Sequence, residues 1–446
     1  MGSMVTKSLD EKIAKQRELV PVMYGKFDFA VTPERFTREL AVESTLPREL
    51  SHKRPALLAD AERVELMRAY TMIGDSVADA YAALMPSYGA RRLISMLDEA
   101  CKRGVEHVQD APPELHAFIR EMERVPEWLD MALVEEGARQ QRNAYAHVAP
   151  YAIRGAFFAT FMNKYSALPM AITGTLSHKT AARRIRETAT FFVTSVLPGA
   201  LERFGEGFRA AAMVRLMHSM VRYNVLARER GWDKRVYGVP IPQVDQMPAG
   251  MINVFLLSRE VLRQKRTSFT PAERAIVELS RYRCYLLGLP EELLAETPQG
   301  IVDMWNTRAS TLRAGFDDAT CGALVRATMQ ADLSTGDNFA ARVQSRMERG
   351  FAKLFFVQNF ANRDRAAAKQ VGIDVSHLDY AVGLATAIFL ASQLKLFDVA
   401  SHVPVLRDVA DRHLVRKLVE LLGHYGHAEF ASHAEAYRPV PLAAAH

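Results

Sequence analysis

The chain has 446 residues, of which 49% are hydrophobic and 24% are charged. This composition is typical of a globular protein with a large core and excludes a largely disordered chain. The 57 Lys and Arg exceed the 51 Asp and Glu by only six and are scattered along the chain, so the sequence gives no support to nucleic-acid binding, which usually depends on clustered positive charge.

Most of the chain is predicted to be helical. Apolar residues recur at intervals of three and four along long segments, whereas alternating patterns and tight hairpin turns are rare. In TPAERAIVEL, Thr270 is placed to cap a helix, Pro271 suits its first turn and Glu273 completes a capping box. We therefore predict an all-α fold. The main helices are expected at residues 57–84, 115–124, 126–140, 178–195, 204–230, 271–288, 318–332, 337–360, 379–397 and 404–425.

The two ends of the chain are expected to be frayed. Residues 1–23 are polar and charged, and residues 439–446 form a tail rich in small residues. Between them, residues 24–438 contain no internal repeat and no low-complexity linker, so we predict a single helical domain. No basic-then-apolar leader opens the sequence, which predicts a cytoplasmic location, and secretion stays open if a leader was removed.

The most apolar segment, residues 380–397, is a candidate for a membrane helix. It is interrupted by Lys395 and is shorter than the roughly 20 residues that are needed to cross a bilayer. We therefore predict a buried core helix at this place and no integral membrane segment.

The helix expected at 204–230 carries polar residues within an apolar sequence. In VRLMHSMVRYNV, His218 lies three residues after Arg215 and four before Arg222, so the three side chains share one side of the helix. Two cations beside a histidine favour its neutral form, which is the form that binds metals. The arginines need anions, supplied either by internal carboxylates or by a ligand with acidic groups. A haem would supply iron to the histidine and two propionates to the arginines, and a structural polar cluster is the alternative.

A second polar face lies on the helix expected at 178–195. In AARRIRETATFF, Arg184 and Thr188 are four residues apart, and Glu187 lies one step round the helix. This face could supply a further propionate contact and a hydroxyl group.

One long stretch, residues 231–251, is predicted to be an irregular loop because it contains three prolines and three glycines. Loops of this length inside compact domains are often functional. This one directly follows the His218 helix, so it is a candidate wall of a pocket there.

Several of these motifs are similar to those of a known family. They are R-I-R-E-T at 184–188, V-R-L-M-H-S-M-V-R at 214–222, W-D at 232–233 and G-V-P-I-P-Q-V-D at 238–245. Together they resemble the latex clearing protein family, which comprises rubber oxygenases and the fungal ER-bound oxygenases of mycophenolic acid biosynthesis. The resemblance covers about residues 180–250.

The resemblance implies a globin-like helical core that holds one non-covalent haem b, with O2 as co-substrate. It implies that His218 is the iron ligand and that Arg215 and Arg222 secure its polar surroundings. It also implies that Arg184 and Thr188 belong to the polar network beside the haem. The absence of a Cys-x-x-Cys-His motif agrees with non-covalent attachment.

Two departures from the family bear on the chemistry. Where the family's characterised member has a lysine able to cap the iron, this chain has Glu187. That member also uses a glutamate about twenty residues before the matching threonine as a base, but residues 163–179 contain no acidic residue. Either Glu187 takes over this role, with a pKa raised by burial, or the chain does not cleave polyisoprene by the same route. Arg184, Glu187 and Thr188 are therefore the candidate catalytic residues.

The leading functional hypothesis is a haem-dependent dioxygenase that cleaves carbon-carbon double bonds of a hydrophobic alkene, either a polyisoprene-like polymer or a smaller terpenoid or lipid. Phe157, Phe158, Phe161 and Met162 would suit an apolar substrate pocket, although they also fit a core. We expect a monomer or weak oligomer that binds no nucleic acid. The alternatives are a haem-dependent peroxidase or isomerase, and a non-catalytic carrier of haem or of a hydrophobic ligand.

Overall fold

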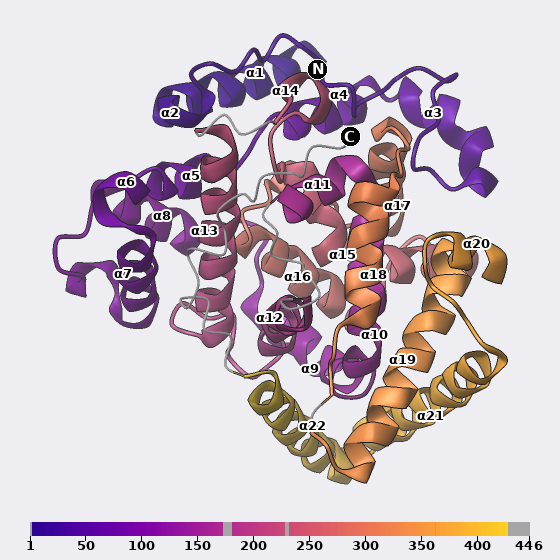
Figure 1. Ribbon diagram of the computed structural model, residues 1–446. Helices are drawn as coiled ribbons and strands as arrows, with labels where there is room; N and C mark the ends of the chain where they lie inside the picture. The colour runs from indigo at the N-terminus through magenta and orange to yellow at the C-terminus, as the bar shows by residue number, and fades with distance from the viewer. Residues whose placement is uncertain (1, 173–180, 228–231, 335, 362, 427–446) are drawn as a thin grey trace. The chain divides into compact units, whose positions relative to one another are not determined.

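A computed structural model describes residues 2–172, 181–227, 232–334, 336–361 and 363–426 (Figure 1). Within these ranges the regular structure is helical, and extended chain pairs only in two isolated bridges, Phe36 with Leu312 and Ser44 with Arg313. The predicted all-α class is therefore confirmed. The predicted tail at 439–446 lies outside the described residues.

Contacts within the chain divide it into two compact units. Apart from the gaps given above, the first unit consists of residues 2–137 and 201–314, and the second of residues 138–200 and 315–426. The expected single domain from 24 to 438 stays a prediction, because two compact units can belong to one domain.

The first unit contains α13 (Glu206–Leu226), whose side chains are almost all buried. This helix packs against α5 (Ser76–Ala82) and α7 (Ala90–Arg103). A helix that is buried over most of its surface must pair most of its polar residues inside the protein, which determines the geometry of the site below. The other helices of this unit are α1 (Gly2–Leu19), α2 (Pro21–Tyr24), α3 (Arg54–Ala59), α4 (Ala61–Thr71), α6 (Met85–Tyr88), α8 (Pro113–Glu123), α14 (Lys234–Tyr237), α15 (Gln243–Arg263), α16 (Pro271–Leu286) and α17 (Pro298–Thr311), and α9 (Met131–His147) starts in it.

Two segments in the N-terminal part of the first unit differ from the sequence prediction. Residues 2–19, expected to be frayed, form α1, which packs on α4 and buries Leu9 and Ile13. The helix expected at 57–84 is interrupted at two aspartates. Asp60 and Asp75 accept hydrogen bonds from the backbone of the following turn, so each caps a new helix, α4 and α5 respectively.

The predicted irregular loop at 231–251 is also wrong over part of its length, because α15 begins inside it at Gln243 and continues through Pro248. Proline has no N–H to donate to the carbonyl oxygen four residues earlier. Here that carbonyl, of Val244, accepts a hydrogen bond from Arg308 Nε of α17 at 2.8 Å. A long-range side chain thus compensates for the proline and allows the helix to form.

The second unit has its own core, built on α10 (Ala149–Phe161), α12 (Ala181–Thr194) and α19 (Phe339–Phe360). Phe157, Phe158 and Phe161 belong to this core, and Met162 packs against it, so these candidate pocket residues are core residues. The other helices are α11 (Lys164–Ile172), α18 (Ala323–Gln330), α20 (Arg365–Gln370), α21 (His377–His402) and α22 (Pro404–Tyr425).

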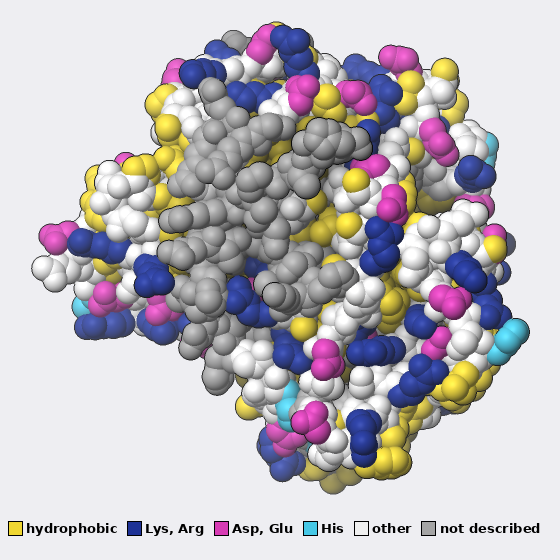
Figure 2. All heavy atoms as spheres, viewed as in Figure 1, with side chains coloured by type: hydrophobic (Ala, Val, Ile, Leu, Met, Phe, Trp, Pro, Cys, Tyr) yellow, Lys and Arg dark blue, Asp and Glu magenta, His cyan; other side chains and the backbone are white. Residues whose placement is uncertain are grey.

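Helix α21 is not the buried core helix that the sequence predicts. One side lies against α19, where a Cβ at Gly383 would be only 2.5 Å from the carbonyl oxygen of Gly350. The outer side is exposed, with Leu384, Ile388 and Leu396 50%, 64% and 61% exposed. Figure 2 shows hydrophobic side chains at the lower edge of the view, over α21 and α22. By length and composition α21 is able to cross a membrane, so the absence of a membrane segment stays a prediction.

Candidate functional site

Two buried ion pairs join α13 to the start of α5 in the first unit. Arg215 donates through Nε and Nη2 to the two carboxylate oxygens of Asp75, at 2.7 and 2.9 Å. Arg222 donates through Nε to Asp79 Oδ1 at 2.8 Å and through Nη1 to the carbonyl oxygen of Ile241 at 2.9 Å. Each guanidinium therefore has a carboxylate partner inside the unit.

The surroundings act differently on the two aspartates. Burial, with the neighbouring charge of Asp75, raises the pKa of Asp79 above its ordinary value, although the charge of Arg222 opposes this shift. Burial alone would raise the pKa of Asp75, but the charge and hydrogen bonds of Arg215 outweigh it and hold this pKa below its ordinary value. Tyr24 donates its hydroxyl to Asp79 Oδ2 at 2.6 Å. Burial, together with the neighbouring Asp79, raises the pKa of Tyr24 well above its ordinary value, so Tyr24 stays a donor.

The ion pairs show which anions balance the two arginines. The sequence leaves internal carboxylates and the propionates of a ligand as alternatives, and the structure supplies carboxylates at Asp75 and Asp79. Arg215 and Arg222 therefore attach α13 to α5, and a propionate is not needed to balance their charge.

His218 lies on a more open side of the same helix. His218 and Val214 are partly exposed, whereas Met217 and Val221 are buried. The Nδ1 atom of His218 lies 3.1 Å from Oε1 of Gln246 on α15. When Nδ1 of a histidine is engaged in this way, Nε2 is the ring nitrogen that the residue offers to a metal.

The segment 238–245, which carries the G-V-P-I-P-Q-V-D motif, places the start of α15. Gly238 has a φ of +67°, a left-handed conformation that favours glycine. Asp245 in the first turn of α15 pairs with Arg35 at 2.6 Å and with Arg308 at 3.1 Å. These constraints fix the beginning of the helix that presents Gln246.

The other predicted group lies in the second unit, where Arg184, Glu187 and Thr188 share a partly exposed face of α12. Glu187 is paired on both sides. Its Oε2 accepts a hydrogen bond from Arg184 Nη1 at 2.8 Å, and its Oε1 lies 3.3 Å from Arg183 Nε. This is an ion-paired arrangement and not the apolar pocket that would activate a base by burial. The catalytic role of these residues stays a prediction.

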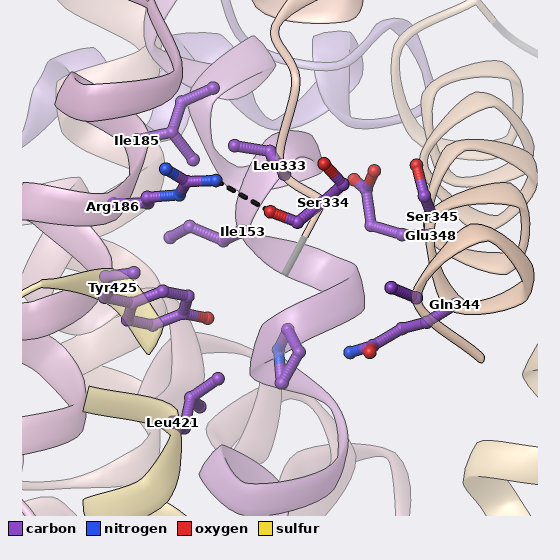
Figure 3. A pocket seen from close by; sticks show the side chains of 13 residues that line it. Ile153, Ile185, Arg186, Leu333, Ser334, Gln344, Ser345, Glu348, Leu421 and Tyr425 are labelled. Carbon is purple, nitrogen blue, oxygen red and sulfur yellow. Dashed lines mark hydrogen bonds between the residues drawn. The ribbon is translucent and has the colours of Figure 1, made fainter. Parts of the chain in front are cut away.

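The second unit also contains a pocket beside α12 (Figure 3), with an empty volume of about 470 Å³ that includes its open mouth. Arg186 crosses it to donate to the carbonyl oxygen of Ser334 at 3.0 Å. The hydroxyl of Tyr425 is buried without a hydrogen-bond partner among the described residues. Apolar walls with a few polar groups are usual for small-molecule sites, but none of the predicted site residues lines this one. Its apolar lining includes Ile153, Ile185, Ala189, Leu333 and Leu421.

The site chemistry agrees with a single-histidine ligand better than with a multidentate metal centre. Across the described ranges, no three His, Cys, Asp or Glu side chains come together as a metal-binding group. A haem iron needs only one axial side chain, because the porphyrin supplies four nitrogens. His218, with Nδ1 engaged, fits that requirement.

Comparisons with known proteins cover the two helices that carry the predicted site residues, α12 and α13. The family model described as "ER-bound oxygenase mpaB/B'/Rubber oxygenase, catalytic domain" matches residues 144–391, more than half of the chain. The chain belongs to this rubber oxygenase family. The matched range includes α12 and α13, and with them all six residues predicted from the motifs.

A solved structure of latex clearing protein LCP in the closed state is similar to this family member. The two share 17% sequence identity with a TM-score of 0.55, over 79% of this chain and 91% of that chain. At this identity the likeness shows the fold alone. It confirms the prediction that this chain has a fold like that of latex clearing protein. No curated protein sequence matches the chain.

Proposed function

We propose that this member of the rubber oxygenase family is a haem b-dependent dioxygenase that cleaves carbon-carbon double bonds of a hydrophobic alkene. Both atoms of O2 enter the products, so one alkene and one O2 give two carbonyl groups. The observation that carries the proposal is His218, a partly exposed histidine on the otherwise buried α13 whose Nδ1 is engaged by Gln246. A histidine held in this way is prepared to bind iron through Nε2.

In this proposal one residue binds the haem iron directly, and others hold that residue in place. His218 would hold the haem iron, and bound haem would supply the binding and activation of O2. Arg215 and Arg222 would act indirectly, because their ion pairs with α5 fix the helix that carries the ligand. Arg184 and Thr188 stay predicted members of the polar network beside the haem, on the resemblance alone.

The proposed substrate class follows from the relatives and not from a defined cavity. The family description names a rubber oxygenase, and the similar solved structure is of a latex clearing protein. Both names support an isoprenoid alkene, which could be a polymer, a smaller terpenoid or an unsaturated lipid.

The test is product formation that depends on O2. Purified protein supplied with haemin is incubated with polyisoprene and, separately, with squalene, under air and under argon, and carbonyl products are trapped with a hydrazine reagent. We expect products only under air. Turnover that requires peroxide and not O2 would favour a peroxidase, and haem binding with no product would favour a carrier.

Glu187→Gln tests whether this carboxylate takes over the role of the family's base despite its ion pairs with Arg183 and Arg184. In that role its loss is expected to lower turnover by roughly 10²-fold, the lower end of the range for general acid-base catalysis, while the haem absorption spectrum is unchanged. The substitution keeps the shape of the side chain but removes its capacity to accept a proton. The initial rate at saturating alkene measures the effect. Glu260→Gln, on the exposed side of α15, is the control and should keep the wild-type rate. An unchanged rate in Glu187→Gln would leave this residue as a structural partner of Arg183 and Arg184.

A further inference from the structure

A chain of side-chain amides connects His218 to the backbone of the loop before α5. Gln246 Oε1 lies 3.1 Å from His218 Nδ1, and Gln246 Nε2 donates to Gln243 Oε1 at 3.1 Å. Gln243 Nε2 in turn donates to the carbonyl oxygen of Gly74 at 3.0 Å. Both glutamines are buried, which limits competition from water for these hydrogen bonds.

The far end of this chain is itself fixed in place. The N–H of Gly74 donates to Gln16 Oε1 of α1 at 3.2 Å. The backbone N–H of Gln243 donates to the carbonyl oxygen of Ile73 at 3.1 Å, so the same loop is held from α15 as well. The carbonyl of Gly74 is therefore a positioned acceptor.

The direction of each hydrogen bond follows from that carbonyl, which can only accept. Gln243 must present its NH₂ group to Gly74 and its oxygen to Gln246. Gln246 must then present its NH₂ group to Gln243 and its oxygen to His218. An amide oxygen can only accept, so the ring nitrogen that faces it must carry a proton. A backbone carbonyl thus determines the protonation of His218 Nδ1 through two side chains.

We propose that Gln246, oriented by Gln243, is a positioning residue that holds His218 as the tautomer with its proton on Nδ1 and its lone pair on Nε2. This inference deepens the proposed function and rests on it for the identity of the iron, whereas the tautomer itself requires no haem. Fixing the tautomer in advance removes the competing state in which Nε2 carries the proton and cannot bind a metal. A neutral amide partner, unlike a carboxylate, also keeps the ring a neutral imidazole ligand.

The first experiment reads the tautomer in the haem-free protein from the ¹⁵N chemical shifts of His218, under conditions in which the ring is neutral. We expect a protonated Nδ1 in the wild type. Gln246→Leu removes the acceptor and should give a mixture of tautomers, and Gln246→Glu restores an acceptor of the same length and should restore the Nδ1 proton. Gln243→Leu should also give a mixture of tautomers. Without Gln243, the side-chain amide of Gln246 is free to rotate and exchange the positions of its oxygen and its NH₂ group.

The second experiment uses the haem-loaded protein. Gln246→Leu should weaken haem affinity by roughly 10–100-fold, the usual effect of losing the partner of a metal-bound histidine. It should also lower the iron-histidine stretching frequency in the resonance Raman spectrum of the ferrous protein, and Gln246→Glu should raise it. Gln264→Leu, at the exposed end of the same helix, is the matched control and should change neither quantity.

Unchanged ¹⁵N shifts in both Gln246→Leu and Gln243→Leu would overturn the proposal. If either variant loses its helical circular dichroism, Gln246→Glu decides, since an unprotonated Nδ1 in this variant would also overturn it. If the wild type takes up no haem while the ¹⁵N shifts follow the expected pattern, the proposed function fails and the positioning role stands.

Discussion

Asp79→Asn is expected to lower the free energy of unfolding by about 3–5 kcal/mol, the usual cost of breaking a buried ion pair by removing one partner. The side chains of Arg222 and Asp79 are both 0% exposed. The substitution keeps the volume of Asp79 but leaves the Arg222 guanidinium buried without its countercharge. Because this pair attaches α13 to α5, the loss should also weaken the hold on the helix that carries His218.

Urea unfolding of the haem-free protein, followed by circular dichroism, measures this loss without a contribution from ligand binding. Two control variants show whether the loss of stability comes from the buried ion pair. Glu260→Gln breaks an exposed pair with Arg263 and should leave the unfolding curve unchanged. Asp79→Asn combined with Arg222→Met removes the unpaired charge and should be more stable than Asp79→Asn alone. Equal losses for Asp79→Asn and Glu260→Gln would contradict the buried pair.

Glu348→Gln is expected to have an effect of similar size in the second unit, about 3–5 kcal/mol. Glu348 accepts two parallel hydrogen bonds from Arg154, Nε to Oε1 and Nη2 to Oε2, each at 2.8 Å. The Arg154 side chain is 0% exposed and also donates to the carbonyl oxygens of Thr328, Met329 and Ala331. Glutamine can accept only one of the two bonds and leaves the guanidinium charge uncompensated.

The same urea experiment measures this effect, and Asp318→Asn is the control within the second unit. Asp318 forms an exposed ion pair with Arg326, so its substitution should change stability little. A loss in Glu348→Gln no larger than in Asp318→Asn would show that the charge of Arg154 is balanced by the three carbonyl groups alone.

Helices with strong local signals can be predicted from the sequence. The capping box of α16 forms between Thr270 and Glu273 as expected. Helix α22 spans Pro404–Tyr425, the predicted range. These features depend on residues within one turn of each other or on an uninterrupted period, so the local sequence is sufficient to predict them.

The site can be predicted only in part, because its partners are distant in sequence. The spacing of Arg215, His218 and Arg222 identifies the helix. The partner aspartates, by contrast, lie 140 and 143 residues away, and Gln246 lies 28 residues from the histidine. No local period relates such residues. The helical start of α15 is missed for the same reason, since the side chain that compensates for Pro248 comes from α17.

Helix α21 shows a different limit of sequence-based prediction, which concerns burial. Its apolar sequence predicts burial. Hydropathy, however, describes the preference of a single side chain and does not show whether another helix covers it. Tertiary packing decides which faces of a helix are covered. Helix α21 packs against α19 and α22, and the rest of its surface is exposed. Length and composition alone therefore do not distinguish a core helix from an exposed one.

Whether His218 binds the iron of a haem b can be read from the ultraviolet-visible spectrum of the purified protein together with a pyridine haemochrome assay, on the wild type and His218→Ala. We predict a Soret band with about one haem b per chain in the wild type, lost or shifted in the variant. A colourless wild type that also fails to take up added haemin would contradict a haem ligand at His218, and the polar group around His218 would then be purely structural.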